Sequence, residues 1–367
     1  MKAVIPCALK EEQLFPFSET LPTSLMPVMG RPIVEHLIES LRSVGVEEVL
    51  IVANHKEDKL REEFEDQRDV QVVHQENVDG TGSAIEAVGS IDEDFFVVNG
   101  DVIVSERDLK SLKKKFESTD PKVSMLAAGE EKPEKFGVLS ITNDEVTSID
   151  EKPEEPDNSL VNTGIYVFKP ELFEVLGGLD EDETSLVDAV KQMADEEEAT
   201  FEIIEDYWVD IGEPRTLKKA DAVKREFEIN ETEIADTAEI HENVDILGDA
   251  VIEEDAKLKP GTVIEGDVYI GKGSDIEPNT RLKNCSISKG CIIDAESVKN
   301  SLVFEENIFD PAVCIEECII GEESEIRSGS VVRGSFIGAR SFIDINNSIR
   351  GVKFVPDART DLSEISK

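Results

Sequence analysis

Asp101 is the residue whose surroundings point most directly to chemistry. It closes the segment Val98-Asn-Gly-Asp101, which follows the apolar run at residues 95–98. In sheets built from alternating strands and helices, ligands bind beyond the carboxyl ends of the strands. A carboxylate at such a strand end can hold a metal ion or face a phosphate group. The alternative is that Asp101 only caps a turn.

The segments that would position Asp101 are short apolar runs separated by helical patterns. Residues 2–5, 49–53, 70–73 and 95–98 are apolar and strand-like, residues 33–44 have helical spacing between Pro32 and Gly45, and a helix opens at residues 82–88. Buried strands that alternate with helices predict an α/β domain with a largely parallel sheet.

The second half of the chain shows a sixfold repeat. An aliphatic residue occupies every sixth position from 240 to 282: Ile240, Ile246, Ile252, Leu258, Ile264, Ile270, Ile276 and Leu282. Neither the helical nor the strand period gives this spacing, which is typical of the hexapeptide-repeat parallel β-helix. The register slips after Leu282, as a loop or an irregular coil would cause, and resumes at Ile320. We expect roughly six coils of about eighteen residues each over residues 232–352.

The charge of the chain excludes several classes of partner. Asp and Glu number 82 against 38 Lys and Arg, for a net charge of −44 spread over the whole sequence. Such a surface repels nucleic acid and anionic membranes. Charge spread in this way is expected in a protein adapted to molar salt, in the cytoplasm of a halophile. The chain has no apolar run near eighteen residues and no basic leader, which predicts a cytoplasmic protein without a membrane span.

Cysteine and histidine spacings do not favour a metal site. The cysteines are Cys7, Cys285, Cys291, Cys314 and Cys318, and they lack the tight ligand pairs of zinc sites, so we expect structural thiols. The histidines at 36, 55 and 74 show no metal-ligand spacing.

Eight segments, taken in order, resemble the sugar nucleotidyltransferases (nucleotide-sugar pyrophosphorylases) that carry a C-terminal hexapeptide β-helix. They are Lys2-Ala-Val-Ile5, Met26-Pro-Val28 with Arg31-Pro-Ile33, Gly80-Thr-Gly-Ser-Ala84, Val98-Asn-Gly-Asp101, Phe136-Gly-Val138, Glu151-Lys-Pro153, Asn162-Thr-Gly-Ile-Tyr166 and Tyr207-Trp-Val-Asp-Ile-Gly212. Each segment is weak alone, whereas eight in order are specific.

The resemblance implies a fold and a reaction. The fold is a Rossmann-like α/β nucleotidyltransferase domain at 1–228, with a mixed, mostly parallel sheet. A left-handed parallel β-helix at 232–352 and a polar tail at 353–367 would follow. In the family reaction a sugar 1-phosphate attacks the α-phosphorus of a nucleoside triphosphate, and pyrophosphate leaves. The family default is uridine or thymidine triphosphate with a glucose-type 1-phosphate.

The resemblance also assigns site residues. Asp101 and Asp210 would hold Mg²⁺, with phosphates supplying other ligands. The remaining residues would bind substrate: Gln75, Gly80 and Thr81 the nucleotide, Gly137, Glu151, Asn162 and Gly164 the sugar, and Lys152 its phosphate. The alternatives are turn capping by the two aspartates and a solvated surface role for Lys152.

The chain departs from the family at the triphosphate loop. The family's opening strand runs into Leu-Ala-Ala-Gly-x-Gly-Thr-Arg and then Pro-Lys-Pro. Here Leu9 and Glu11 replace the two glycines, Gln13 the arginine and Thr23 the lysine, while Lys10 could supply one cation. Such loops bring backbone N–H groups close to phosphate through conformations that glycine adopts cheaply. The residues that would grip the triphosphate are therefore lost.

Three hypotheses follow from these residues. The first is an impaired or inactive relative that still binds a sugar 1-phosphate or nucleotide sugar as a regulatory or scaffolding subunit. The second is an active nucleotidyltransferase with an altered loop. The third is an acyltransferase that uses the β-helix, whose chemistry wants a histidine base, although His241 is the one histidine after residue 74. The open coil edges predict a homo-oligomer, or a hetero-oligomer with an intact paralogue.

Overall fold

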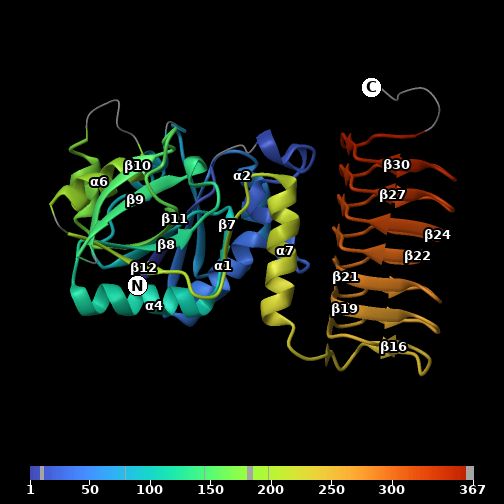
Figure 1. The fold of residues 1–367 in the computed structure, drawn as a ribbon. Coiled ribbons are helices and arrows are strands. Elements are labelled where there is room, and N and C mark those ends of the chain that lie inside the picture. Colours follow the sequence, from blue (N-terminus) through green and yellow to red (C-terminus); the bar gives the residue numbers. More distant parts are fainter. Residues whose placement is uncertain (9–11, 79, 144, 180–184, 197, 361–367) are drawn as a thin grey trace. The chain divides into compact units, whose positions relative to one another are not determined.

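The computed structural model describes residues 1–8, 12–78, 80–143, 145–179, 185–196 and 198–360 (Figure 1). The chain divides into two compact units. The first unit comprises Met1–Lys10 and Ile33–Asp210, and the second comprises Glu11–Pro32 and Ile211–Lys367. Among the described residues, no helix has the length and apolar character needed to cross a membrane.

The first unit is built on a nine-stranded mixed sheet. Its order is β5-β4-β1-β6-β11-β8-β12-β10-β9. The strands are β1 (Lys2–Pro6), β4 (Glu48–Ala53), β5 (Val70–His74), β6 (Phe95–Val98), β8 (Val123–Gly129), β9 (Gly137–Thr142), β10 (Glu145–Glu151), β11 (Leu160–Phe168) and β12 (Ala199–Ile203). Strands β5, β4, β1 and β6 run parallel, whereas β11 runs antiparallel to β6 and β8. Every residue of β6 is buried, as expected for a strand covered on both faces.

Helices connect these strands. They are α1 (Ile33–Ser43), α2 (Glu57–Glu63), α3 (Thr81–Glu86), α4 (Glu106–Thr119), α5 (Leu172–Leu176) and α6 (Leu186–Asp195), with the 3₁₀ turn η4 (Pro133–Lys135). Ser105 caps α4 by accepting from the backbone N–H of Asp108, and Ser185 with Asp188 forms a capping box on α6. A separate ribbon pairs β7 (Val102–Val104) with β13 (Trp208–Asp210). The predicted α/β class is confirmed.

The second unit is dominated by an eighteen-stranded parallel ladder, drawn in orange and red in Figure 1. Its strands are β14 (Glu233–Ile234), β15 (Glu239–Ile240), β16 (Asp245–Ile246), β17 (Ala250–Ile252), β18 (Lys257–Leu258), β19 (Val263–Ile270), β20 (Asp275–Ile276), β21 (Arg281–Ile287), β22 (Ile292–Lys299), β23 (Leu302–Val303), β24 (Ile308–Glu316), β25 (Ile319–Ile320), β26 (Glu325–Ile326), β27 (Val331–Arg333), β28 (Phe336–Ile337), β29 (Phe342–Ile343), β30 (Ser348–Arg350) and β31 (Lys353–Phe354). The repeating aliphatic residues form one buried core, so the predicted β-helix is confirmed.

The register slip after Leu282 comes from shorter coils, not from an inserted loop. Ile246 pairs with Ile264, and Ile264 with Leu282, at intervals of eighteen residues. Leu282 then pairs with Val298, sixteen residues on, and Val298 with Ile315, seventeen on. The ladder remains continuous because the coil corners shorten while the inward residues stay in register. The same length of chain therefore forms more coils than it would with a uniform repeat of eighteen residues.

Two other segments of the second unit pack on the β-helix. They are α7 (Pro214–Glu228) and residues 12–32, which contain η1 (Glu12–Leu14), η2 (Phe17–Glu19), η3 (Thr23–Leu25) and the hairpin of β2 (Pro27–Val28) and β3 (Arg31–Pro32). Arg225 of α7 donates to the carbonyl of Asp267 at 2.8 Å, and Asp221 accepts the backbone N–H of Met29 at 2.9 Å. The predicted division at residue 228 assigns both segments to the α/β domain, whereas the compact units group them with the β-helix.

Candidate functional site

The turn between β6 and β7 fixes the position of Asp101. The backbone N–H of Asn99 donates to the carbonyl of Gly164 at 3.0 Å, and that of Gly100 donates to the carbonyl of Pro6 at 3.1 Å. A Cβ at Gly100 would lie 2.2 Å from the sulfur of Cys7. Only glycine fits between the turn and the end of β1, so Asp101 is held at the carboxyl end of two parallel strands.

Asp210 is the last residue of β13, the other strand of the ribbon, and lies near the same end of the sheet. It pairs with Val102, the residue after Asp101, in the antiparallel β7–β13 register. Trp208, two residues earlier, is buried and packs edge-on against Phe136 with ring centroids 5.6 Å apart. The two aspartates predicted as metal ligands are thus neighbours in the fold, although 109 positions separate them in sequence.

The donor set at this strand end fits a magnesium ion that is shared with phosphates. Asp101 and Asp210 supply hard carboxylate oxygens, and the Oδ1 atom of Asp101 is buried. Mg²⁺ is usually held by one or two carboxylates while substrate phosphates and waters complete its shell. Among the described residues, no cluster of three or more His, Cys, Asp or Glu forms a cage for a metal. Two carboxylates therefore suit an ion that arrives with its substrate.

Gly137, Glu151 and Asn162 converge beside this end of the sheet. Gly137 pairs directly with Glu151 across β9 and β10. A Cβ at Gly137 would lie 2.9 Å from Glu151 Oε2 and 3.7 Å from the Cβ of Asn162. The absence of a side chain at Gly137 leaves room beside the Glu151 carboxylate. This carboxylate is half exposed and can accept hydrogen bonds from hydroxyl groups.

Asn162 is oriented by its own strand. Its Nδ2 donates to the hydroxyl of Tyr166 at 2.5 Å, and its Oδ1 accepts the backbone N–H of Gly164 at 3.2 Å. Burial raises the pKa of Tyr166, and the Glu151 carboxylate raises it further against the opposing hydrogen bond from Asn162. The phenol therefore stays protonated at neutral pH, and its O–H can donate.

Gly164 lies where the β8–β11 register shifts, between Asn162 and Tyr166. Its φ of 75° is in the left-handed region, and a Cβ there would lie 2.3 Å from Asn99 Nδ2. Gly164 therefore packs directly against Asn99 in the turn between β6 and β7. Asn99 and Tyr166 were not predicted as site residues, although both lie within segments that carry the family resemblance.

Lys152 remains on the surface. Its backbone has φ 49° and donates to the carbonyl of Phe136 at 2.9 Å, and its Nζ lies 3.6 Å from Glu151 Oε1. Its side chain is 65% exposed. It is therefore close to Glu151 and accessible to solvent.

Two of the residues predicted to contact the nucleotide have internal hydrogen bonds. Gln75 is buried, and its Nε2 donates to the carbonyl of Asn77 at 2.9 Å and to the hydroxyl of Ser83 at 2.8 Å. Thr81 begins α3 after Gly80, and its hydroxyl accepts the backbone N–H of Leu186 at 2.9 Å. Gln75 therefore links the end of β5 to α3, and Thr81 links the start of α3 to the start of α6.

The triphosphate-loop positions are only partly described. Leu9, Lys10 and Glu11 lie outside the described residues. Gln13 is exposed on η1, whereas Thr23 is 7% exposed on η3 and its hydroxyl meets no hydrogen-bond partner among the described residues. Neither side chain carries a positive charge.

The residues around these loop positions pack on the β-helix. Phe17 is 1% exposed, and its ring centroid lies 5.3 Å from that of Phe304 and 6.4 Å from that of Phe336. A Cβ at Gly30 would lie 2.2 Å from the ring of Tyr269. The segment therefore has a structural role that is independent of any phosphate.

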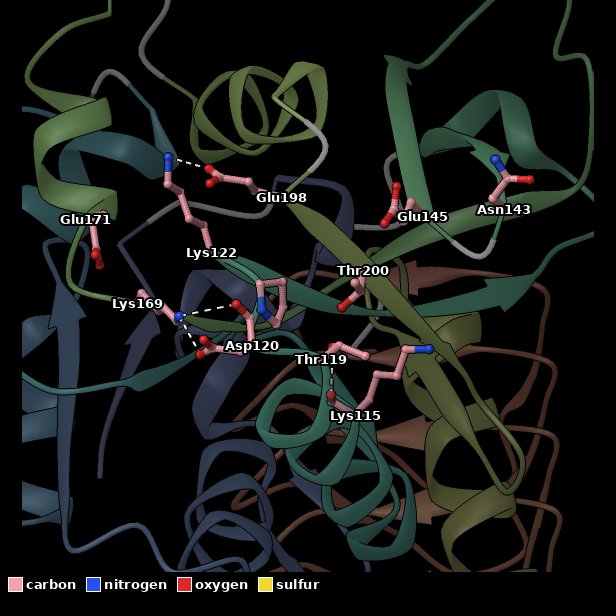
Figure 2. Close-up of a pocket in the computed structure, with 11 residues that line it drawn as sticks. Lys115, Thr119, Asp120, Lys122, Asn143, Glu145, Lys169, Glu171, Glu198 and Thr200 are labelled. Atoms are coloured by element: carbon pink, nitrogen blue, oxygen red, sulfur yellow. Dashed lines mark hydrogen bonds and ion pairs between the residues drawn. The ribbon is translucent and has the colours of Figure 1, made fainter.

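A separate pocket of about 530 Å³ opens at the opposite end of the sheet, where β8 and β12 begin and β11 ends (Figure 2). Lys169 contacts Asp120 Oδ1 at 2.5 Å, and Lys122 contacts Glu196 at 3.0 Å and also Glu198. The hydrogen bonds that Lys122 donates to Glu198 and Glu196 raise its pKa. These cations are neutralised within the pocket, and none of the predicted site residues lines it.

Comparisons with known proteins identify the family of this chain. The family model described as nucleotidyl transferase matches residues 9–226, and one described as GMPPB C-terminal domain matches residues 246–337. The bifunctional protein GlmU of Methanocaldococcus jannaschii is 33% identical over 70% of this chain, but the match spans only 61% of that relative's length. GlmU of Methanococcus aeolicus is 34% identical over 88% of this chain and 79% of the relative.

A solved structure shares the fold over about two thirds of this chain. It is a putative glucose-1-phosphate thymidylyltransferase from Bacillus anthracis in complex with a sucrose, with a TM-score of 0.58 and 23% identity, covering 64% of this chain and 98% of that one. The nucleotidyl transferase match spans more than half of the sequence. With the GlmU relatives, it shows that the chain belongs to the nucleotidyl transferase family, among the sugar-1-phosphate nucleotidyltransferases that carry a C-terminal β-helix.

Proposed function

We propose that this chain binds a sugar 1-phosphate or a nucleotide sugar and is impaired in nucleotidyl transfer, serving as a regulatory or scaffolding subunit. The observation that carries the proposal is a contrast between two groups of residues. Gly137, Glu151 and Asn162 converge as a sugar site requires, while the loop positions described, Gln13 and Thr23, are neutral and one is buried.

The family reaction depends on aligning the sugar 1-phosphate with the triphosphate and on neutralising the charge of the triphosphate. A hydrogen bond from a cationic donor contributes about 1.5–3 kcal/mol. With Gln13 and Thr23 in place of an arginine and a lysine, two such donors are missing. The loss of about 3–6 kcal/mol corresponds to a rate reduced roughly a hundredfold to ten-thousandfold.

Sugar binding would use the residues that remain. Glu151 accepts hydrogen bonds from sugar hydroxyl groups, and Gly137 leaves space for the sugar ring. Asn162 presents its side-chain amide, which its hydrogen bond to Tyr166 holds in place. Lys152 attracts the phosphate. A Mg²⁺ ion held by Asp101 and Asp210 would neutralise phosphate charge when bound.

Calorimetry and a pyrophosphate assay, run on the same preparation, test this proposal. The full chain in about 1 M KCl with Mg²⁺, where charge screening reaches ~3 Å, is titrated with uridine and thymidine diphosphate sugars and with sugar 1-phosphates. We expect binding that Glu151→Gln weakens and that the exposed control Glu155→Gln leaves unchanged. Little pyrophosphate should be released with any nucleoside triphosphate.

Two results would overturn the proposal. Absence of binding by every sugar ligand, from folded protein, would remove the sugar-site assignment. Rapid pyrophosphate release that Asp101→Asn abolishes and the exposed control Asp92→Asn retains would instead support an active nucleotidyltransferase with an altered loop.

A further inference from the structure

Polar residues follow the parallel strands of the first unit, and one such segment is not part of the predicted site. Gln75 follows β5, and the turn with Asp101 follows β6. Strand β4, which lies between β5 and β1, is followed by Asn54, His55 and Lys56. Ligands of sheets of this class bind beyond the carboxyl ends of the strands. The segment after β4 therefore lies at the same edge of the sheet as the predicted nucleotide and metal sites.

Hydrogen bonds fix this segment to the end of β5. The backbone N–H of Gln75 donates to the carbonyl of Ala53 at 2.8 Å, which continues the pairing of β4 with β5 beyond the strands. The side-chain Nδ2 of Asn54 donates in turn to the carbonyl of Gln75 at 2.9 Å. The turn that carries His55 and Lys56 is thus held next to a residue predicted to contact the nucleotide.

The side chains of His55 and Lys56 contact each other. Lys56 Nζ lies 2.8 Å from His55 Nε2, and both residues are partly buried. An ammonium group can only donate hydrogen bonds, so His55 Nε2 is the acceptor and carries no proton. The backbone of Lys56 has a φ of 53°, in a region that lysine seldom adopts. The ammonium group is therefore held close to the end of β4 instead of extending freely into solvent.

The carboxylate that follows Lys56 in the chain is bound by two basic side chains. Glu57 Oε2 lies 2.5 Å from Nδ1 of His74, the last residue of β5, and Glu57 Oε1 accepts from Nε of Arg61 at 2.7 Å. These contacts offset the negative charge of Glu57. A phosphate group at the end of β4 therefore meets less repulsion than the acidic composition of the chain implies.

A nucleotide that reaches from Gln75 to an ion at Asp101 must cross the ends of β4 and β1. These two strands separate β5 from β6 in the sheet order. The nucleotide then spans three strand spacings, roughly 14 Å at about 4.8 Å each. Residues 5–8 at the end of β1 contain no Lys or Arg, whereas the segment after β4 contains Lys56. Lys56 is therefore the cation that the described residues of these two strand ends supply.

We propose that Lys56, positioned by His55, binds the diphosphate of a nucleotide sugar. The inference rests on the proposed function, in which this chain still binds a sugar 1-phosphate or a nucleotide sugar, and it selects the nucleotide sugar as the ligand class. Cationic donors form strong hydrogen bonds to phosphate oxygens. The contact replaces part of the positive charge lost with the loop arginine and lysine, so the chain keeps affinity for nucleotides although it is impaired in nucleotidyl transfer.

Calorimetry of the full chain with the two halves of a nucleotide sugar tests this contact. In the KCl and Mg²⁺ buffer given above, the chain is titrated with the diphosphates of uridine, thymidine, guanosine, adenosine and cytidine. Separate titrations use glucose 1-phosphate and N-acetylglucosamine 1-phosphate, which carry no nucleotide. We expect at least one nucleoside diphosphate to bind, and Lys56→Gln to weaken that binding about tenfold or more. Lys56→Arg, which keeps the charge, should retain most of the affinity.

Matched variants separate the phosphate contact from effects on the fold. Lys59→Gln removes the same charge from an exposed position three residues further along and should bind like the wild type. His55→Gln keeps a side-chain acceptor for Lys56 and should retain more affinity than His55→Leu, which has none. Binding of the sugar 1-phosphates should not change in any of these variants, because Glu151 and Asn162 lie on the other side of β6 from β4 in the sheet order. Circular dichroism checks that every variant is folded.

The proposal is wrong if Lys56→Gln binds nucleoside diphosphates as tightly as Lys59→Gln does. It is also wrong if Lys56→Gln loses affinity for sugar 1-phosphates to the same extent, because Lys56 would then act on the fold. A folded wild type that binds a sugar 1-phosphate but no nucleoside diphosphate would contradict the Lys56 contact and leave the proposed function standing. Binding of a nucleoside diphosphate without any sugar 1-phosphate would instead remove the sugar site and keep the Lys56 contact.

Discussion

At the residue scale, Gly137 is the most sensitive position of the candidate sugar site. In Gly137→Ala the new Cβ would lie 2.9 Å from both Glu151 Oε2 and Ile149 Cγ2, closer than side chains pack. Overpacking of this kind costs about 1–3 kcal/mol. We expect calorimetry to show affinity for a nucleotide sugar reduced by about tenfold or more, since 1.4 kcal/mol is a factor of ten.

The matched control for this prediction is Gly129→Ala. A Cβ at Gly129 would meet no atom within 4 Å, and Gly129 lies at the exposed end of β8. Equal affinities for the two variants would mean that the space beside the Glu151 carboxylate is not used by the ligand.

The five cysteines form two groups that differ in burial. All five are thiols, and burial raises the pKa of Cys285 and Cys291 to about 12 and that of Cys318 to about 11. Because the thiolate is the reactive form, these three should resist a disulfide reagent in the folded protein near pH 8, and their reactivity should rise only as the pH approaches those values.

Labelling followed by mass spectrometry checks this expectation. The partly exposed Cys7 and Cys314 should account for the modification of the native chain, and denaturant should release all five thiols. Modification of Cys291 at the rate of Cys314 under native conditions would contradict the packing of the β-helix core.

At the scale of elements, the segment at residues 12–32 should stabilise the second unit through Phe17. Its ring packs against the rings of Phe304 and Phe336 and is almost fully buried. Truncation of a buried phenylalanine to alanine costs about 3–5 kcal/mol. We expect Phe17→Ala to lower the denaturant midpoint of the second unit's unfolding, followed by circular dichroism.

The control for Phe17 is Phe227→Ala on α7, where the side chain is 43% exposed and the cost should be far smaller. If Phe17→Ala unfolds at the wild-type midpoint, the segment does not stabilise the β-helix. The burial of Phe17 would then need another explanation within this chain.

Prediction from the sequence succeeded where residues recur at a fixed spacing, or where a polar residue follows a buried strand. The sixfold spacing predicts the β-helix because each inward aliphatic residue reports on the same core. Asp101 is expected at the carboxyl end of the sheet because it follows a buried strand, and the register of β7 with β13 brings Asp210 beside it.

The docking of Phe17 could not be predicted, because its partners Phe304 and Phe336 lie 287 and 319 positions away and no periodicity links them. The shortened coils were missed for a different reason. A corner can lose one or two residues without moving an inward side chain, so the sequence shows only a phase shift. The predicted nucleotide contact of Gln75 stays a prediction, since in this structure its amide donates to the carbonyl of Asn77 and to the hydroxyl of Ser83.

At the scale of the whole molecule, charge sets the conditions under which the fold is stable. Even if every Lys and Arg paired with a carboxylate, 82 minus 38 leaves 44 carboxylates without a cation. Salt therefore has two opposing effects. It weakens exposed ion pairs, which contribute about 0–1 kcal/mol each, and it screens the repulsion among the excess carboxylates. The excess repulsion is the larger effect because it acts over the entire surface.

We therefore expect the melting temperature to rise as KCl increases from about 0.15 M to about 1 M, where the screening length falls from ~8 Å to ~3 Å. Thermal unfolding followed by circular dichroism at a fixed protein concentration measures this. Because assembly also raises the melting temperature, the experiment is repeated at a second protein concentration, where the same upward trend should appear. A melting temperature that stays constant or falls with KCl would mean that local ion pairs, not the excess of carboxylates, dominate the electrostatics of this fold.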